Sequence, residues 1–197
     1  MSGRPALFLD RDGVLIEDIH LMTEVSAVRI LPGVPEAVAR AQALGLPVIG
    51  VSNQSVVARG MCTEEQVAAV NRHIEAEMIA AGCQPILAFY FCPHHPEATV
   101  AAYRQVCDCR KPNPGMLLRA ASEHGIDLGA SFMVGDRPTD VLAGYRAGCT
   151  TIAVDTGVQD VPLLSGVSAD ELVDADYECS DLGAAVDFIA VRLQGRG

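Results

Sequence analysis

Two aspartates spaced two residues apart, Asp10 and Asp12, directly follow a short apolar run near the start of the chain. If residues 6–9 form a buried strand, both carboxylates project to the same side beyond its carboxyl end, where open α/β sheets bind their ligands. One carboxylate can attack an electrophile while the other gives or takes a proton. Two like charges this close resist ionising together, so the pair also calls for a hard divalent cation. The alternative is an acidic loop that only caps the strand.

A second group of reactive side chains lies in one short segment. Cys92, His94, Cys107 and Cys109 supply three thiols and one imidazole. In a chain that starts without a signal-like segment, clustered soft ligands favour a metal over disulfides, and zinc prefers this set in closed tetrahedral sites. His95 is an alternative ligand to His94, and a redox-active Cys-x-Cys pair is the alternative to a metal. The remaining cysteines are expected to be reduced thiols: Cys62, Cys83, Cys149 and Cys179.

Length and composition limit the class of protein. The 197 residues, half of them hydrophobic, suffice for a sizeable aliphatic core, and we expect a single domain over residues 1–197 with a zinc loop at 92–109. The net charge of −11 argues against a nucleic-acid partner, which requires a basic face. No apolar run approaches the roughly 20 residues of a membrane span. We therefore expect a cytoplasmic protein without a membrane partner, and a monomer because no surplus apolar face is evident.

Strand-like and helix-like segments alternate along the chain. Thr63 and Gln66 fit a capping box at the start of a helix, and Asn113-Pro114 is typical of an N-cap followed by proline at the first helical position. The expected strands cover residues 6–9, 47–51, 86–91, 131–134 and 151–154, and the expected helices begin near residues 34, 63, 114, 139 and 181. The stretch from 157 to 175 is less regular. This alternation predicts an α/β fold, a Rossmann-like parallel sheet with helices on both faces.

Polar side chains follow four of the expected strands. They are Asp10 and Asp12 after the first, Ser52, Asn53, Gln54 and Ser55 after the second, Arg110 and Lys111 beyond the zinc loop that follows the third, and Asp136, Arg137 and Asp140 after the fourth. The carboxyl ends of parallel strands meet at one edge of a sheet, so these clusters are expected to form one site.

These clusters resemble a known family. Asp10-x-Asp12-Gly13, Ser52, Lys111 and Gly135-Asp136 with Asp140 are similar to the four motifs of the haloacid dehalogenase superfamily of phosphatases, over essentially the whole chain. Asn53-Gln54-Ser55 and the cysteine-histidine loop resemble the branch that contains the heptose bisphosphate and histidinol-phosphate phosphatases. Histidinol-phosphate phosphatases usually carry Asp-Gly after Asn-Gln, so the chain is more similar to the heptose side of the branch. A small phosphorylated sugar is the expected substrate, with histidinol phosphate or another small phosphorylated metabolite as the alternative.

The resemblance implies a Mg²⁺-dependent reaction through an aspartyl-phosphate. Asp10 would be the nucleophile and Asp12 the general acid and base, while Ser52 and Lys111 would bind the phosphoryl oxygens. Mg²⁺ would be held by Asp10, the Asp12 backbone carbonyl and Asp136. The implied substrate-binding residues are Asn53, Gln54, Ser55, Arg110 and Arg137. A catalytically silent, zinc-stabilised binding protein with the same fold is the alternative from a different class.

The sequence leaves the roles of Asp140 and Arg59 open. Asp140 is expected to orient Lys111, to cap a helix or to bind the metal, and Arg59 is either a substrate contact or a loop residue. Residues 17–22 differ from the Asp-x-Gly-Tyr-Val-like stretch usual in heptose phosphatases, which leaves the exact sugar open.

Many superfamily members carry a large cap domain, but residues 13–31 and the segment between the second and third strands are too short for one. We expect the zinc loop to form part of the site wall instead.

Overall fold

Six parallel strands form the centre of the molecule. The computed structural model describes residues 3–19, 21–157 and 171–195. The strands are β1 (Leu7–Leu9), β2 (Val48–Asn53), β3 (Ala88–Cys92), β4 (Phe132–Gly135), β5 (Thr150–Val154) and β6 (Tyr177–Cys179). They lie in the order β3-β2-β1-β4-β5-β6 with every neighbouring pair parallel. The predicted Rossmann-like sheet is confirmed, and the order changes direction at β1, where ligands bind in such sheets.

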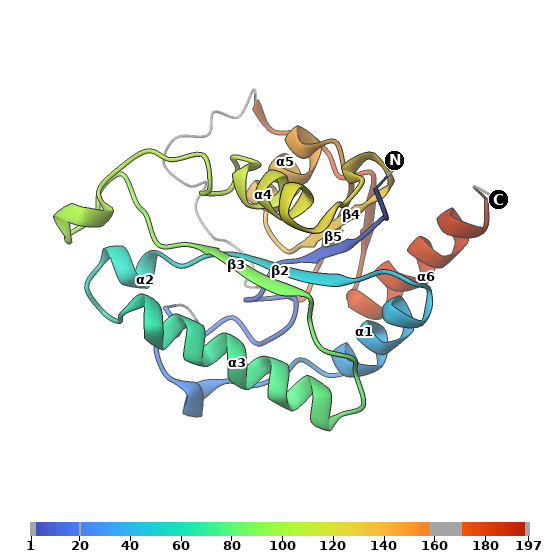
Figure 1. The fold of residues 1–197 in the computed structure, drawn as a ribbon, viewed down its shortest axis with the longest axis horizontal. Helices are drawn as coiled ribbons and strands as arrows, with labels where there is room; N and C mark the ends of the chain where they lie inside the picture. The colour runs from blue at the N-terminus through green and yellow to red at the C-terminus, as the bar shows by residue number, and fades with distance from the viewer. Residues whose placement is uncertain (1–2, 20, 158–170, 196–197) are drawn as a thin grey trace.

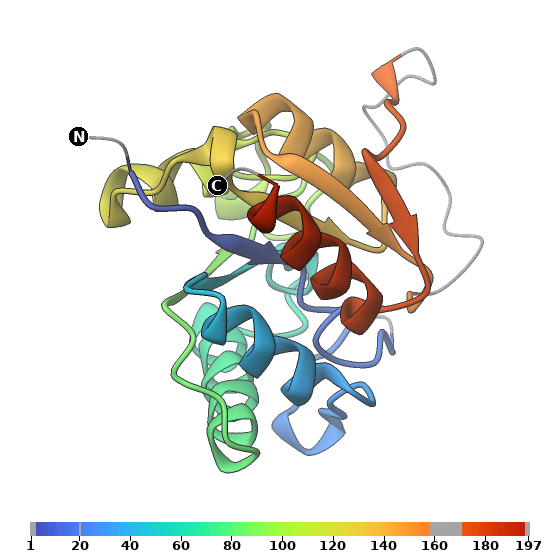
Figure 2. The same ribbon diagram turned by 90° about the vertical axis from the view of Figure 1, so that its right-hand side faces the viewer.

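Helices cover both faces of the sheet (Figures 1 and 2). They are α1 (Val34–Ala43), α2 (Ser55–Ala58), α3 (Glu64–Ala80), α4 (Gly115–His124), α5 (Pro138–Ala147) and α6 (Leu182–Gln194). One face is covered by α1, α3 and α6, and the other by α4 and α5. Strand β1 serves both faces, since Leu7 and Leu9 belong to one core and Phe8 to the other, as the two-residue period of a strand requires.

The termini of several elements differ from the sequence-based prediction. The capping box of Thr63 and Gln66 is confirmed at the start of α3. The prediction that Asn113 caps α4 was wrong, because its side-chain amide donates to the carbonyl of Cys107 at 2.8 Å and the helix begins at Gly115. Strand β2 extends through Asn53, so two residues expected in a loop end the strand. Helix α2 and the edge strand β6 were not predicted, and most of the irregular stretch from 157 to 175 lies outside the described residues.

Two long connections shape the carboxyl end of the sheet. The segment between β1 and α1 contains only the 3₁₀ helix Val25–Ala27, and the segment between β2 and β3 contains only α2 and α3. Neither forms a cap domain in the part of the chain that the structure describes. The loop between β3 and α4, with the 3₁₀ helix Ala101–Tyr103, extends beside the strand ends, at the left of Figure 1.

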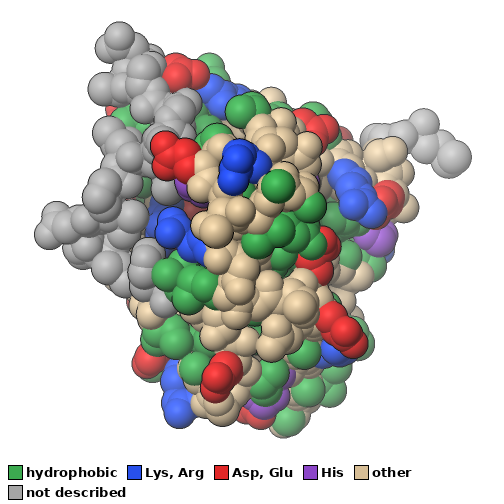
Figure 3. Space-filling model, turned by 90° about the vertical axis from the view of Figure 1, so that its left-hand side faces the viewer, with side chains coloured by type: hydrophobic (Ala, Val, Ile, Leu, Met, Phe, Trp, Pro, Cys, Tyr) green, Lys and Arg blue, Asp and Glu red, His purple; other side chains and the backbone are tan. Residues whose placement is uncertain are grey.

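The surface near the strand ends is mixed in character. In Figure 3, which faces this side, single basic side chains lie among acidic, hydrophobic and polar ones. Among the described helices, none is both long enough and apolar enough to cross a membrane.

Candidate active site

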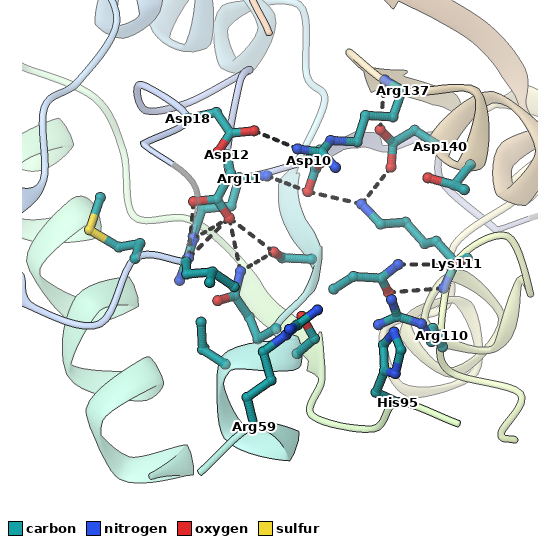
Figure 4. Close-up of a pocket in the computed structure, with 18 residues that line it drawn as sticks. Asp10, Arg11, Asp12, Asp18, Arg59, His95, Arg110, Lys111, Arg137 and Asp140 are labelled. Atoms are coloured by element: carbon teal, nitrogen blue, oxygen red, sulfur yellow. Dashed lines mark hydrogen bonds and ion pairs between the residues drawn. The ribbon is translucent and has the colours of Figure 1, made fainter. Parts of the chain in front are cut away.

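One pocket at the carboxyl end of the sheet gathers the predicted residues (Figure 4). It is bounded by the loops after β1, β2 and β4 and by the segment before α4. All nine residues predicted as catalytic or substrate-binding line it: Asp10, Asp12, Ser52, Asn53, Gln54, Ser55, Arg110, Lys111 and Arg137. Arg59 and Asp140, whose roles were left open, line it as well. The predicted magnesium ligand Asp136 lies next to this lining, with its side chain only 1% exposed.

Lys111 joins two buried carboxylates. Its Nζ lies 2.9 Å from Oδ1 of Asp10 and 2.6 Å from Oδ1 of Asp140, and it donates to the carbonyl of Val51 at 2.8 Å. Burial opposes the charge of Lys111, but the two carboxylates outweigh it and raise its pKa. Oδ1 of Asp10 also accepts a hydrogen bond from the Arg11 amide at 2.7 Å. Among the described residues, the Arg11 amide and the Lys111 ammonium both bind Oδ1 of Asp10. Oδ2 of Asp10 is therefore the oxygen placed to attack an electrophile.

Asp136 adds a third carboxylate to this group. Ligand oxygens of Asp10, Asp136 and Asp140 lie within 4.8 Å of one another, and neither carboxylate oxygen of Asp136 has a hydrogen-bond partner in the described structure. Burial, followed by the neighbouring carboxylates, raises the pKa of Asp10 to about 7 and that of Asp136 to about 8. Lys111 pairs with two of these three buried carboxylates, and the Arg137 Nε lies 3.7 Å from the third, Asp136. This excess of negative charge and the oxygen donor set fit a divalent cation such as Mg²⁺.

Gly13 permits the close approach between the β1 loop and Asp136. Its φ is 83°, in the left-handed region, and a Cβ at this position would lie 2.6 Å from Cγ of Asp136. The hydroxyl of Thr156 donates to the Gly13 carbonyl at 2.5 Å, which ties the loop after β5 to the same turn. A larger residue at position 13 would therefore displace a predicted metal ligand.

Asp12 is oriented by a buried arginine. The side chain of Arg11 is 1% exposed, and its Nε and Nη2 donate to Oδ2 and Oδ1 of Asp12 at 3.0 and 3.1 Å. Gln54 donates to Oδ2 of Asp12 at 2.8 Å and to the hydroxyl oxygen of Ser52 at 2.6 Å. The side chain predicted to act as general acid is thus fixed from two sides. Gln54, predicted to bind substrate, is buried and positions Asp12 in this structure.

Asn53 uses its side-chain amide within the protein. Its Nδ2 donates to the carbonyl of Lys111 at 2.9 Å, and its Oδ1 accepts from the amide of Lys111 at 3.0 Å. These two hydrogen bonds attach the backbone of Lys111 to the end of β2. Asn53 was predicted to bind substrate, and in this structure it positions Lys111.

Basic side chains form another part of the pocket wall. Arg59, His95 and Arg110 lie together in Figure 4, apart from Asp10 and Asp140. Nη1 of Arg110 donates to the carbonyl of His94 at 3.1 Å, which fixes its guanidinium. Burial, and then Arg110 and Arg59, lower the pKa of His95. This wall offers positive charge to an anionic part of a ligand.

The predicted zinc ligands come together beside this wall. The sulfurs of Cys92, Cys107 and Cys109 lie 3.2–3.5 Å apart, and Nδ1 of His94 lies 3.6 Å from the first and 3.4 Å from the third. Zinc–sulfur bonds of about 2.3 Å in a tetrahedral site give ligand separations of roughly 3.7 Å, so these four atoms could hold zinc. His95 is not part of the cluster; its Nδ1 accepts a hydrogen bond from the Glu97 amide at 3.1 Å.

Comparison with known proteins gives the family. A family model described as HAD-hydrolase-like matches residues 108–184. The D-glycero-beta-D-manno-heptose-1,7-bisphosphate 7-phosphatase of Yersinia pestis is 41% identical over 154 residues, which cover 78% of this chain and 81% of that protein. The D-glycero-D-manno-heptose-1,7-bisphosphate 7-phosphatase of Thermosynechococcus vestitus is 41% identical over 197 residues, which cover 98% and 99%. The chain belongs to the heptose-1,7-bisphosphate 7-phosphatase family.

A solved structure supports this membership. The D,D-heptose 1,7-bisphosphate phosphatase from B. bronchiseptica, complexed with magnesium and phosphate, aligns with a TM-score of 0.78 at 28% identity, covering 95% of this chain and 99% of that chain. Membership of the heptose-1,7-bisphosphate 7-phosphatase family confirms the resemblance predicted from the four motifs and the cysteine-histidine loop. It also makes the chain a phosphoric monoester hydrolase of the haloacid dehalogenase type.

Two charged residues of the site were not predicted in this member of the heptose-1,7-bisphosphate 7-phosphatase family. Arg11 lies between the two motif aspartates, and a buried cation there leaves no periodic signal. Asp18 lies in the segment that was noted only for its difference from the family pattern, yet it lines the pocket. Asp140 fulfils two of its three suggested roles, since it pairs with Lys111 and its Oδ2 accepts from the Arg137 amide at 3.1 Å.

Proposed function

We propose that the protein is a Mg²⁺-dependent phosphatase that removes the 7-phosphate of D-glycero-D-manno-heptose 1,7-bisphosphate. The observation that carries this proposal is the buried group of three carboxylates around Lys111, placed beside a pocket with a basic wall. Membership of the heptose phosphatase family supports the choice of sugar.

The reaction proceeds through an aspartyl-phosphate. Oδ2 of Asp10 attacks phosphorus, the bond between phosphorus and the sugar oxygen breaks, and Asp12 gives a proton to that oxygen. Asp12 then takes a proton from the water that hydrolyses the aspartyl-phosphate, so one group serves as acid and base in turn. Lys111 and the Ser52 hydroxyl place positive charge and a hydrogen-bond donor beside the transferred group, whose charge must be stabilised.

The proposed metal site uses residues of this same pocket. Asp10, Asp136 and the backbone carbonyl of Asp12 would hold Mg²⁺, which supplies the positive charge that lets an anionic carboxylate approach an anionic phosphate. We assign a structural role to zinc at the four-residue cluster, where it would hold the loop before Arg110 and Lys111 in place.

The basic wall suits the second phosphate of the substrate. Arg110 and Arg59 can donate paired hydrogen bonds to phosphate oxygens, and Arg137 lies nearer to the carboxylates. Ser55, at the start of α2, lines the same pocket and is proposed as a contact to the sugar.

The direct test is phosphate release by the purified protein with Mg²⁺. The substrates are both anomers of the heptose 1,7-bisphosphate, histidinol phosphate and a panel of other sugar phosphates. We expect a strong preference for one heptose anomer. Activity restricted to histidinol phosphate or to another part of the panel would overturn the substrate, and silence throughout would favour the binding-protein alternative.

Replacing Asn53 by Ala should lower kcat by about tenfold or more, because the backbone of Lys111 loses two partly buried hydrogen bonds. Steady-state kinetics measure the effect. Gln42→Ala is a matched control, since the Gln42 amide makes the same pair of bonds, both 2.8 Å long, to the backbone of Gln84 far from the pocket. If the two variants show the same kcat, Asn53 has no positioning role.

Mg²⁺ should stabilise the protein more at about pH 8 than at about pH 5.5. In the metal-free protein the pKa values of Asp10 and Asp136 are about 7 and about 8, above the ordinary value of 3.8. A carboxyl with a raised pKa in the folded state contributes stability at low pH that is lost as the pH rises from about 4 to about 8. Mg²⁺ replaces the protons, so the increase in Tm on adding it should grow over this window. Calorimetry with and without Mg²⁺ checks this, and a constant increase would contradict it.

A further inference from the structure

The guanidinium of Arg137 lies between two carboxylates at the pocket. Its Nη2 donates to Oδ2 of Asp18 at 2.5 Å (Figure 4). Its Nε lies 3.7 Å from Oδ2 of Asp136. The contact with Asp18 is a hydrogen bond, whereas the distance to Asp136 is too long for one. The side chain of Asp18 is 6% exposed and that of Arg137 is 24% exposed. The ion pair is therefore largely shielded from solvent.

The two ends of Arg137 are held by different elements. Its backbone amide donates to Oδ2 of Asp140 at 3.1 Å, at the start of α5. Its guanidinium is held by Asp18, which belongs to the loop after β1. Because the backbone is fixed, the position of the guanidinium depends on the flexible side chain and its partner Asp18.

Asp136 would attract this guanidinium strongly. Both of its carboxylate oxygens are buried without a hydrogen-bond partner in the described structure, and the Arg137 Nε lies 3.7 Å from Oδ2. A movement of about 1 Å would bring the Arg137 guanidinium within hydrogen-bond distance of the Asp136 carboxylate. Paired hydrogen bonds between these two groups are favourable. An arginine paired with Asp136 would occupy an oxygen that the metal needs and would repel the cation itself.

We propose that Asp18 is a positioning residue that holds the Arg137 guanidinium away from Asp136 and so keeps this carboxylate available to a divalent cation. The proposal rests on the proposed Mg²⁺ site, in which Asp136 is a ligand. It assigns a role to Asp18, the acidic residue of segment 17–22 that lines the pocket. Asp18 itself acts through Arg137, not on the metal.

The test is Mg²⁺ binding to the full chain without substrate, measured by titration calorimetry. Asp18→Asn is expected to weaken Mg²⁺ binding about tenfold, since it frees a cation to pair with one of the ligands. In the Arg137→Gln background the same change should weaken binding only about twofold, the effect of losing one nearby charge. Glu17→Gln, which removes the neighbouring exposed charge, measures that general effect in the wild-type background.

Each outcome of this cycle has a definite meaning. A large loss in Asp18→Asn that disappears when Arg137 is also replaced supports the proposal. Asp18→Asn binding like Glu17→Gln, or losing the same factor with and without Arg137, overturns it. Thermal unfolding of the metal-free variants confirms that they are folded. If the wild-type protein does not bind Mg²⁺, the proposed metal site itself is wrong. If the wild-type protein binds Mg²⁺ and Asp18→Asn binds it equally well, only the positioning role of Asp18 is wrong.

Discussion

Replacing Asp10 by Asn is expected to reduce phosphate release at least about ten-thousandfold, the order of loss that follows removal of the nucleophile in a covalent mechanism. The amide has the size of the carboxylate, and its oxygen can still accept the bonds that now come from the Arg11 amide and Lys111 at 2.7 and 2.9 Å. Its nitrogen takes the place of the attacking oxygen and is not a nucleophile towards phosphorus. The measurements are kcat with Mg²⁺ and rapid-quench detection of a phosphorylated protein, which the variant should not form.

Asp136→Asn separates loss of the nucleophile from loss of the metal. It removes a buried carboxylate of the proposed metal site but leaves Asp10 intact. Its activity should recover in part at high Mg²⁺, whereas that of Asp10→Asn should not. Asp187→Asn, at a side chain that is 66% exposed, controls for the loss of one charge. If Asp10→Asn kept more than about one hundredth of the wild-type turnover, Asp10 would not be the nucleophile.

The parallel sheet could be predicted because its strands carry their signal locally. Five strands are short apolar runs between amphipathic helices, and their burial on both faces explains why those runs are nearly continuous. Strand β6 (Tyr177–Cys179) gives no such signal, since it has three residues, two of them exposed, and it is defined by pairing with β5. Helix α2 (Ser55–Ala58) is too short to show a helical period. These elements depend on contacts between distant parts of the chain.

The residues that line the pocket could be predicted from the sequence, but the contacts between them could not. Residues after parallel strands converge by topology alone, so their types and positions predicted one site. Which partner each side chain takes depends on distances across the fold. Asn53 and Gln54 appeared to be available for substrate, yet their amides bind the Lys111 backbone and Asp12. Such pairings, like that of Asp18 with Arg137 across 119 positions, have no signature in residue spacing.

Loss of zinc is expected to lower Tm by about 10 °C or more and kcat/KM at least about tenfold. Bound zinc contributes free energy on the order of 10 kcal/mol in small zinc sites, and few side chains of the loop between β3 and α4 are buried. Pro93 and Ala98 are its buried apolar residues between the proposed ligands Cys92 and Cys107. Cys107→Ser tests this at a proposed ligand that is farther along the sequence from Lys111 than Cys109 is, with zinc content, calorimetry and steady-state kinetics as measurements. Cys179→Ser, at a half-buried cysteine on β6, is the matched control and should change none of them.

The effect on catalysis follows from the order of residues along the loop. Arg110 and Lys111 come directly after the proposed zinc ligand Cys109, and the Arg110 guanidinium donates to the carbonyl of the proposed ligand His94. A loosened loop therefore displaces the proposed phosphate-binding Arg110, while Asn53 still attaches Lys111 to β2. For this reason KM for the bisphosphate should rise by a larger factor than kcat falls. A zinc-free protein with unchanged stability and kinetics would contradict the structural role of zinc, and a fall in kcat alone would show that the loop acts on Lys111 instead.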